Sequence, residues 1–160
     1  METDRRTLLT VAGLGVLTAA CGSGPAEAAQ TFAFNLTDAE WKKRLSPAAY
    51  DVLRHEGTER PYSSPLNKEK RAGVYACGGC TLPLFSSNTK FESGTGWPSF
   101  YAPLANAVVT RTDRTLGFSR TEVRCRRCGG HLGHVFDDGP RPTGKRYCMN
   151  GVAMTFKPKA

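Results

Sequence analysis

The sequence lacks any hydrophobic run long enough to cross a membrane. Its longest uncharged apolar stretch, Leu8–Ala20, has 13 residues, whereas a membrane-spanning helix needs about 18 or more. At 160 residues, the chain is also too short for two domains of ordinary size. These absences argue against an integral membrane protein and predict a single globular domain.

The sequence also lacks a cluster of one charge sign. It has 22 Lys and Arg residues against 14 Asp and Glu, a formal net charge of +8, but the basic residues are scattered. The densest group, Arg124, Arg126 and Arg127, is interleaved with two cysteines. A nucleic-acid interface needs basic residues gathered on one face, so we expect a solvated surface and no nucleic-acid partner.

Glycine and proline are abundant, with 17 and 10 residues, which favours a turn-rich β fold. Thr37 and Glu40 form a capping-box pattern that predicts a first short helix, and Ser46-Pro47 predicts a second helix that Gly57 ends. Short β-rich segments separated by Gly, Pro and Asp follow at residues 73–76, 107–111, 121–124 and 152–156. Together they predict a mainly β fold, in which two antiparallel sheets form a twisted, barrel-like domain after the short helices.

Residues 1–30 have the pattern of an export signal and tether, which leaves residues 31–160 as the folded domain. Arg5 and Arg6 precede the apolar stretch, as in a twin-arginine signal. The sequence before Cys21 resembles a lipobox, which favours a lipid anchor on that cysteine, whereas Ala26–Ala28 offers an alternative cleavage site that would remove it. Either way, we expect an exported bacterial protein, periplasmic or membrane-anchored on the extracytoplasmic face.

Four of the six cysteines form two C-x-x-C pairs, Cys77-Gly-Gly-Cys80 and Cys125-Arg-Arg-Cys128. Two such tight turns can enclose one tetrahedral cation with four thiolates and leave no open position for water. The pattern therefore predicts one structural zinc ion held by zinc-ribbon knuckles. The alternative is two redox pairs or disulfides, although neither pair precedes the helical pattern typical of thioredoxin-type motifs.

Cys148 remains once Cys21 and the four predicted ligands are set aside. Lys145 and Arg146 lie close to it in the sequence, and nearby cations favour the nucleophilic thiolate. A lone cysteine is more often an inert, buried hydrophobic residue. On spacing alone, both interpretations of Cys148 stay open.

Five blocks in order, together with both C-x-x-C pairs, resemble the B-type methionine sulfoxide reductases, which act on the R epimer of the sulfoxide. The resemblance extends from about Trp41 to the C-terminus. The blocks are residues 57–59 with 63–65 (GTE and SSP), 90–100 (KFESGTGWPSF), 120–125 (RTEVRC), 131–140 (HLGHVFDDGP) and 146–150 (RYCMN).

The resemblance implies thiol-dependent reduction of oxidised methionine in proteins or peptides. Cys148 would attack the sulfoxide sulfur and become a sulfenic acid. His131, His134 and Asn150 would line the oxygen side of the pocket and donate hydrogen bonds or a proton.

The resemblance also implies how the pocket binds substrate. Trp97, with Phe136, would form an apolar wall for the S-methyl group. Arg146 would favour the Cys148 thiolate through its charge.

One departure from the family pattern concerns recycling of the sulfenic acid. Many family members have a resolving cysteine where this chain has Thr95. Cys148 should therefore be recycled by an external thiol, from a thioredoxin-like protein or a small molecule. We expect a monomer. Two other classes remain as alternatives, a non-enzymatic zinc-ribbon binding module and a thiol peroxidase.

Overall fold

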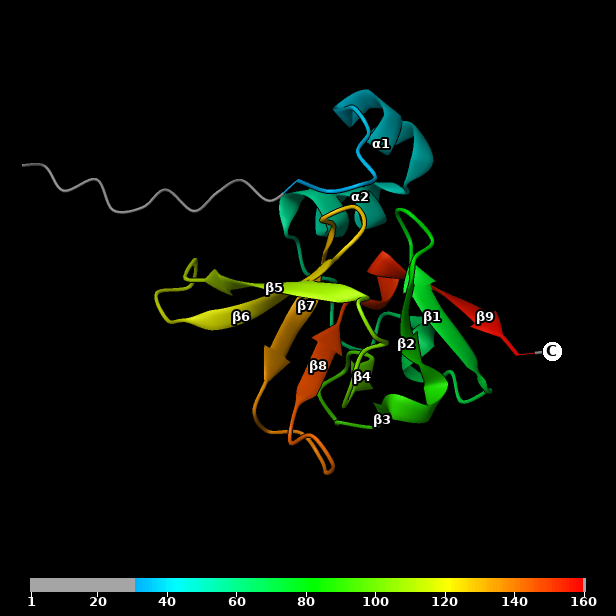
Figure 1. Cartoon of the computed structure of the whole chain (residues 1–160), viewed down its shortest axis with the longest axis vertical. Coiled ribbons are helices and arrows are strands. Elements are labelled where there is room, and N and C mark those ends of the chain that lie inside the picture. The colour runs from blue at the N-terminus through cyan, green and yellow to red at the C-terminus, as the bar shows by residue number, and fades with distance from the viewer. Residues whose placement is uncertain (1–30, 160) are drawn as a thin grey trace, which may run out of the picture. The chain divides into compact units, whose positions relative to one another are not determined.

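The computed structural model describes residues 31–159, which form two short helices followed by two antiparallel sheets (Figure 1). The predicted export signal, including Cys21, lies outside the described residues and stays a prediction. None of the helices within residues 31–159 has the length and apolar character needed to cross a membrane.

Helix α1 (Asp38–Arg44) begins with the predicted capping box. The Thr37 hydroxyl accepts a hydrogen bond from the Glu40 amide at 3.4 Å, and the Glu40 carboxylate accepts one from the Thr37 amide at 2.8 Å. These two bonds satisfy amides that have no partner inside the helix. Local sequence therefore determines where α1 begins.

Helix α2 (Pro47–His55) begins at Ser46, as predicted, but ends differently. Glu56, rather than Gly57, takes the left-handed conformation, with φ of 60°. A Cβ at Gly57 would lie 2.0 Å from Oδ2 of Asp51, the movable end of an exposed side chain, so the glycine eases the close approach of the chain to α2.

The smaller sheet has three strands in the order β2–β1–β9, all antiparallel. Its strands are β1 (Gly73–Cys77), β2 (Pro83–Ser86) and β9 (Met154–Pro158). The predicted strand at 152–156 is wrong in its first half. Val152 and Ala153 belong to the 3-10 turn η3 (Gly151–Ala153), and the strand begins only at Met154.

The larger sheet has six antiparallel strands in the order β3–β4–β8–β7–β6–β5. The first three in chain order are β3 (Lys90–Phe91), β4 (Ser99–Phe100) and β5 (Val108–Asp113), and the next are β6 (Arg120–Cys125), β7 (His131–Phe136) and β8 (Arg146–Met149). Two further 3-10 turns, η1 (Pro65–Asn67) and η2 (Ser87–Thr89), lie in the connections. The order inserts β8 between β4 and β7, which brings three distant sequence blocks together.

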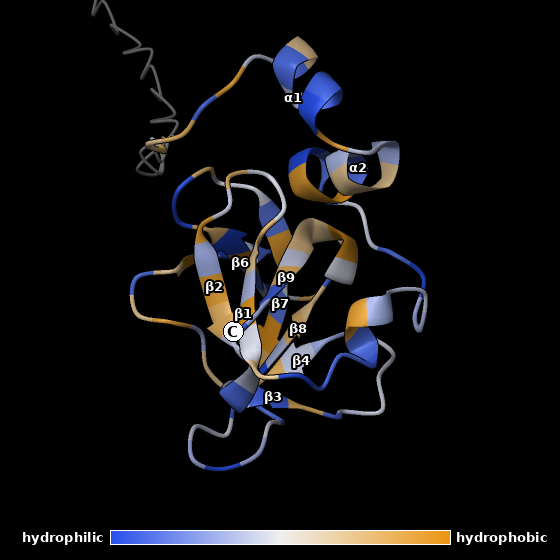
Figure 2. Ribbon diagram, turned by 90° about the vertical axis from the view of Figure 1, so that its right-hand side faces the viewer, coloured by the Kyte–Doolittle hydropathy of each residue, from blue (hydrophilic) through white to orange (hydrophobic). Residues whose placement is uncertain are grey.

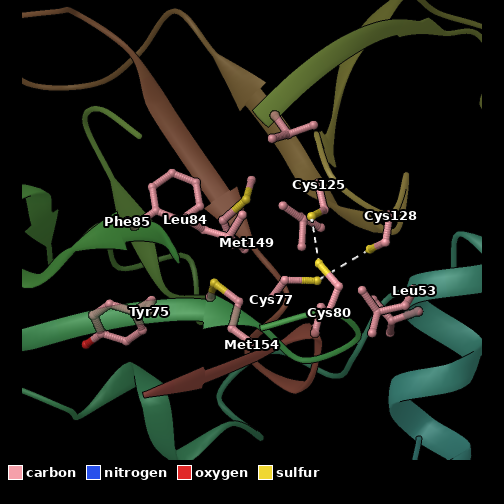
Figure 3. Packing of buried hydrophobic residues seen from close by; sticks show 14 of the residues in the cluster. Leu53, Tyr75, Cys77, Cys80, Leu84, Phe85, Cys125, Cys128, Met149 and Met154 are labelled. Atoms are coloured by element: carbon pink, nitrogen blue, oxygen red, sulfur yellow. Dashed lines mark hydrogen bonds between the residues drawn. The ribbon is translucent and has the colours of Figure 1, made fainter. Parts of the chain in front are cut away.

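Hydrophobic residues gather in the strands and on α2, whereas the outer loops are mostly hydrophilic (Figure 2). The rings of Phe85 and Phe100 stack with centroids 4.4 Å apart, and Tyr75 meets Phe100 edge-on at 4.9 Å. Leu53 of α2 joins this core near the four cysteines of the two C-x-x-C motifs (Figure 3). The mainly β fold with two antiparallel sheets and two N-terminal helices confirms the predicted architecture.

Candidate active site and metal centre

The two C-x-x-C pairs converge on one buried cluster (Figure 3). Cys77 ends β1 and Cys125 ends β6, while Cys80 and Cys128 lie in the tight turns that follow. The Sγ atoms of Cys77 and Cys128 are 3.7 Å apart, and those of Cys80 and Cys125 are 3.5 Å apart. All four thiols are free. Their convergence from two distant turns confirms the predicted metal-binding arrangement.

The sulfur spacing fits a tetrahedral metal ion. Ligands at about 2.3 Å from zinc lie roughly 3.8 Å from one another at the corners of a tetrahedron. The ligand atoms here all lie within 4.8 Å of one another, and each of the four residues is buried. Four soft sulfur donors in a closed site are typical of structural zinc rather than of calcium or magnesium.

Guanidinium groups surround this centre. Arg44 and Arg127 donate to the carbonyls of Gly79 and Cys80, at 2.6 and 3.2 Å. Arg54 and Arg124 donate in the same way to the carbonyls of Cys128 and Gly129, at 3.2 and 2.8 Å. The cations stabilise both turns and lie near the charge that four thiolates would carry. Arg124 and Arg127 lie beside the second cysteine pair in the sequence, whereas Arg44 and Arg54 reach the turns only through the folding of α1 and α2.

Cys148 lies in β8, half-buried, at a cavity of about 140 Å³. The cavity is lined by Thr58, Trp97, Arg120, Gly133, His134, Phe136, Cys148 and Asn150. Four larger cavities, of about 520, 510, 410 and 240 Å³, contain no cysteine, and among them only the 410 Å³ cavity contains a histidine, His55. The small cavity is therefore the one at which nucleophilic and proton-donating groups meet.

A β-bulge brings His131 and His134 to the same side of β7. Residues three apart in a regular strand point to opposite faces. Here Val123 pairs with Gly133 and Arg124 with His131, so Leu132 is an extra residue in β7. The two imidazole rings consequently meet edge-on, with centroids 5.4 Å apart.

Gly133 is essential to this bulge. A Cβ at that position would lie 2.1 Å from the carbonyl oxygen of Cys148. The glycine therefore lets β7 approach β8 closely beside the reactive thiol.

Each histidine is held by a carboxylate. His131 Nδ1 lies 2.8 Å from Glu122 Oε1, and His134 Nε2 lies 2.8 Å from Asp113 Oδ2. Burial opposes the charge on Glu122, but His131 and nearby arginines outweigh it and hold the pKa of Glu122 below its ordinary value. Hydrogen bonds from Thr115, His134 and Arg120 lower the pKa of Asp113.

Only one of the two histidines lies on the cavity wall. His134 lines the cavity, and burial lowers its pKa despite the contact with Asp113. His131 lies deeper, at 2% exposure, and its Nε2 has no hydrogen-bond partner. A buried nitrogen without a partner is costly, and it is ready to bind a polar substrate atom or a water molecule.

Glu59, which sequence reasoning gave no role, holds the opposite wall together. Its carboxylate accepts hydrogen bonds from the amides of Gly151 at 2.6 Å and Val152 at 2.9 Å. Its carbonyl accepts the indole N–H of Trp97 at 3.1 Å, and its amide donates to Asn150 Oδ1 at 3.0 Å. Glu59 thus fixes Trp97 and Asn150, two of the predicted pocket residues. Its presence in the GTE block was the only sequence signal.

Asn150 is tied to the backbone through both ends of its amide. Besides accepting from Glu59, it donates from Nδ2 to the carbonyl of Leu132 at 3.2 Å. It is 4% exposed and lines the cavity. The side chain is positioned rigidly, and Nδ2 keeps one proton for a further acceptor.

Arg146 lies over the ring of Phe136, with its guanidinium carbon 4.5 Å from the ring centroid. It is also bound through two hydrogen bonds, at 2.9 and 2.8 Å, to the carboxylate of Asp138. Lys145 likewise pairs with Asp137. Both cations that the sequence places beside Cys148 are therefore neutralised in part.

Burial raises the pKa of the Cys148 thiol above its ordinary value, and this effect outweighs the lowering contributions of Thr95 and Arg146. Arg146 acts in the predicted direction, but its contribution is smaller than that of burial. Burial therefore works against the thiolate that the neighbouring cations in the sequence favour.

Known proteins place these features in a family. The SelR domain model matches residues 45–158. The peptide methionine sulfoxide reductase MsrB of Pseudomonas putida (strain W619) is 57% identical over 121 residues, which cover 75% of this chain and 91% of that protein. MsrB of Agrobacterium fabrum (strain C58) is 52% identical over 125 residues, or 78% and 93% of the two chains.

MsrB of Methanosarcina barkeri is 57% identical over 122 residues, covering 76% of this chain and 86% of that protein. Among solved structures, a Mis18 "Yippee-like" domain aligns with 56% of the chain at 17% identity and a TM-score of 0.46, too low to indicate a shared fold. Because the SelR model and these relatives cover most of the chain, it belongs to the SelR-domain family of B-type methionine sulfoxide reductases.

Proposed function

We propose that the protein reduces the R epimer of methionine sulfoxide in proteins or peptides to methionine. One observation carries this proposal: the Cys148 thiol lies at a small cavity that is lined by both aromatic and polar side chains. Trp97 and Phe136 suit the S-methyl group, and His134 and Asn150 suit the oxygen. Different partners for the methyl group and for the oxygen around one nucleophile favour a single configuration at sulfur.

In the proposed reaction, Cys148 Sγ attacks the sulfoxide sulfur, and the oxygen passes to Sγ as the sulfur–oxygen bond of the sulfoxide breaks. The thiol and the sulfoxide give Cys148 sulfenic acid and the methionine thioether, so the cysteine is oxidised by two electrons and the substrate is reduced by two. A proton must reach the sulfoxide oxygen as negative charge develops there.

His131, which lies deeper than His134, is our candidate for stabilising that oxygen. Its Nδ1 faces Glu122, so an imidazolium would be stabilised by the carboxylate and would present Nε2–H, the atom without a partner. His134, held through Nε2 by Asp113, is the nearer wall residue. Asn150 would add a neutral donor from Nδ2.

The test is single-turnover reduction of each epimer of a methionine sulfoxide peptide with dithiothreitol as reductant. We expect the R epimer to be reduced and the S epimer and hydrogen peroxide to react far more slowly. Cys148→Ser should abolish turnover without changing the circular dichroism spectrum. Full activity in Cys148→Ser, or faster turnover of peroxide than of sulfoxide, would refute the proposal.

For recycling, we propose that an external thiol attacks the sulfenic acid. That attack releases water and forms a mixed disulfide, and a second thiol then regenerates Cys148. This route is supported by the composition of the described residues, in which every other cysteine belongs to the metal centre. A thioredoxin-like protein or a small thiol would supply both electrons.

Substituting Thr95 tests this route. Thr95 Oγ1 lies 3.9 Å from Cys148 Sγ, so a cysteine at residue 95 would place its thiol beside that of Cys148, and rotation of the two side chains must close the rest of the gap to a bond of about 2.05 Å. After one turnover without reductant, we expect the unmodified protein to carry a sulfenic acid that dimedone traps, and Thr95→Cys to carry a disulfide to Cys148. Mass spectrometry distinguishes them. A disulfide between Cys148 and Cys77 in the unmodified protein would contradict this route.

For the metal centre, we propose one zinc ion with a structural role, held by Cys77, Cys80, Cys125 and Cys128. The sulfur spacing and the absence of an open ligand position support this choice. We also propose export directed by residues 1–30, with a lipid anchor at Cys21, on the basis of their sequence pattern. Cell fractionation and the intact mass of the mature protein test the second proposal.

A further inference from the structure

Three hydroxyl groups form a continuous chain behind the reactive thiol. The chain begins at Cys148 Sγ, which lies 3.9 Å from Thr95 Oγ1. Thr95 Oγ1 lies 2.8 Å from Ser93 Oγ, which in turn lies 2.7 Å from Ser99 Oγ. Ser99 donates to the carbonyl of Trp97 at 3.1 Å. We call Thr95, Ser93 and Ser99 the hydroxyl chain.

The sheet holds this chain in place. Ser99 in β4 pairs directly with Cys148 in β8, so both side chains project from the same face of the sheet. Ser99 is 1% exposed. The Thr95 amide also lies 3.4 Å from Ser93 Oγ, which orients Ser93 within its turn. The far end of the chain is therefore buried, and its near end touches the reactive sulfur.

The number of protons in the hydroxyl chain limits the direction in which its hydrogen bonds can run. Each hydroxyl has one proton to donate and can accept two hydrogen bonds. When Cys148 is a thiol, donation can run from Cys148 through Thr95 and Ser93 to Ser99 and the carbonyl of Trp97. Every contact then has one proton. When Cys148 is a thiolate, the first contact lacks a proton unless Thr95 turns to donate to sulfur.

If Thr95 turns, Ser93 and Ser99 must turn as well to keep one proton in each contact between side chains, and Ser99 then gives up its hydrogen bond to the carbonyl of Trp97. We infer that the hydroxyl chain stabilises the Cys148 thiolate by reversing the direction of its hydrogen bonds, with Thr95 as the direct donor and Ser93 and Ser99 as positioning residues. The chain offsets part of the desolvation that burial imposes on the thiolate. This role deepens the proposed function, because it acts on the proposed nucleophile.

Burial raises the pKa of Cys148, and the hydrogen bond with Thr95 is the largest contribution in the opposite direction. Arg146 lowers the pKa through its charge and through a hydrogen bond, each a smaller effect than that of Thr95, and its guanidinium is shared with Asp138. The hydroxyl chain therefore stabilises the Cys148 thiolate in addition to the neighbouring cations.

Alkylation of Cys148 by iodoacetamide as a function of pH tests this inference without requiring sulfoxide reduction. Mass spectrometry of the peptide containing Cys148 gives the rate for that residue. We expect Thr95→Val to raise the midpoint pH by about one unit, a tenfold loss of thiolate near neutral pH. Because a more basic thiolate is a stronger nucleophile, its plateau rate at high pH should be at least that of the unmodified protein.

Thr95→Ser keeps the hydroxyl and should restore the midpoint. Ser93→Ala removes the second member and should give a smaller upward shift. Thr121→Val is the matched control, because Thr121 is an exposed residue of β6, and it should leave the midpoint unchanged.

An unchanged midpoint in Thr95→Val, or equal shifts in Thr95→Val and Thr95→Ser, would overturn the inference. A shift in Thr95→Val with none in Ser93→Ala would overturn the reversal of the whole chain. If Thr95→Val does not fold, the midpoint of Ser93→Ala alone tests the inference, and an unchanged midpoint there would overturn it. Failure here leaves the proposed reduction standing, because the epimer assay tests that separately.

Discussion

At the scale of single residues, Glu59 shows how one residue can organise a pocket that it does not line, through both its side chain and its backbone. It fixes Trp97, Asn150 and the start of η3 through four hydrogen bonds, two to its carboxylate and two to its own backbone. Buried amides without an acceptor are costly, so the two carboxylate bonds matter for stability as well as for geometry.

We therefore expect Glu59→Ala to lower the free energy of unfolding by about 1–3 kcal/mol, because two amides lose their acceptor. It should also lower kcat/KM by at least tenfold, because the carboxylate anchors residue 59 to Gly151 and Val152, and without that anchor the backbone groups of residue 59 that bind Trp97 and Asn150 are no longer held in place. Denaturant unfolding and the sulfoxide assay measure the two effects. Glu59→Gln retains one strong acceptor and should be intermediate. Wild-type kcat/KM in the alanine variant would contradict the assigned role.

At the scale of elements, the hairpin of β5 and β6 supplies the carboxylates that hold both histidines of β7. Asp113 at the end of β5 contacts His134 and also pairs with Arg120 at 2.5 Å. Glu122 in β6 contacts His131. The hairpin thus orients the catalytic candidates from two strands: Glu122 lies on the strand next to β7, and Asp113 lies on the strand beyond it.

The lowered pKa of Asp113 predicts a specific pH dependence. A carboxyl group with a lowered folded-state pKa stabilises the fold above its ordinary pKa near 3.8, and this contribution is lost as the pH falls below that value. Asp113→Asn should therefore reduce stability by about 1–2 kcal/mol at pH 7, with the difference from wild type narrowing below pH 4.

Thermal unfolding between pH 7 and pH 3 measures this difference. Asp137→Asn is the control, since the Asp137 side chain is 84% exposed, and it should show no such trend. A stability difference between Asp113→Asn and wild type that stays constant from pH 7 to pH 3 would refute the stabilising role of the ionised Asp113.

At the scale of the whole domain, the four-cysteine centre joins the two sheets. Cys77 ends β1 of the smaller sheet, and Cys125 ends β6 of the larger one. A metal ion held by both would tie together strands that are far apart in the sequence. Because such binding is coupled to folding, its loss should affect the entire domain.

We expect Cys77→Ser to lose zinc and to unfold or become strongly destabilised. Elemental analysis of the purified protein and its thermal melting curve provide the measurements. Cys148→Ser makes the same chemical change outside the centre and should retain zinc and the melting temperature. A stable, metal-free Cys77→Ser protein with normal reductase activity would rule out the structural role.

Short-range patterns in the sequence determined the helix starts at Thr37 and Ser46, the two metal-binding turns and most of the strands. These features depend on residues within a few positions of one another, so capping, turn chemistry and C-x-x-C spacing suffice. The ordered blocks around Trp97, His131 and Cys148 also identified the family. Local patterns carry no information on which distant strands become neighbours.

Only the tertiary structure decided how the reactive residues meet. The insertion of β8 between β4 and β7 brings Cys148 beside Ser99 and His134. A single extra residue in β7 turns His131 to the same side as His134, although strand periodicity alone would separate them. The direction in which the pKa of Cys148 shifts also depends on the tertiary structure. Neighbouring cations in the sequence favoured a thiolate, but desolvation in the folded protein is the larger effect, and burial is a property of the whole fold.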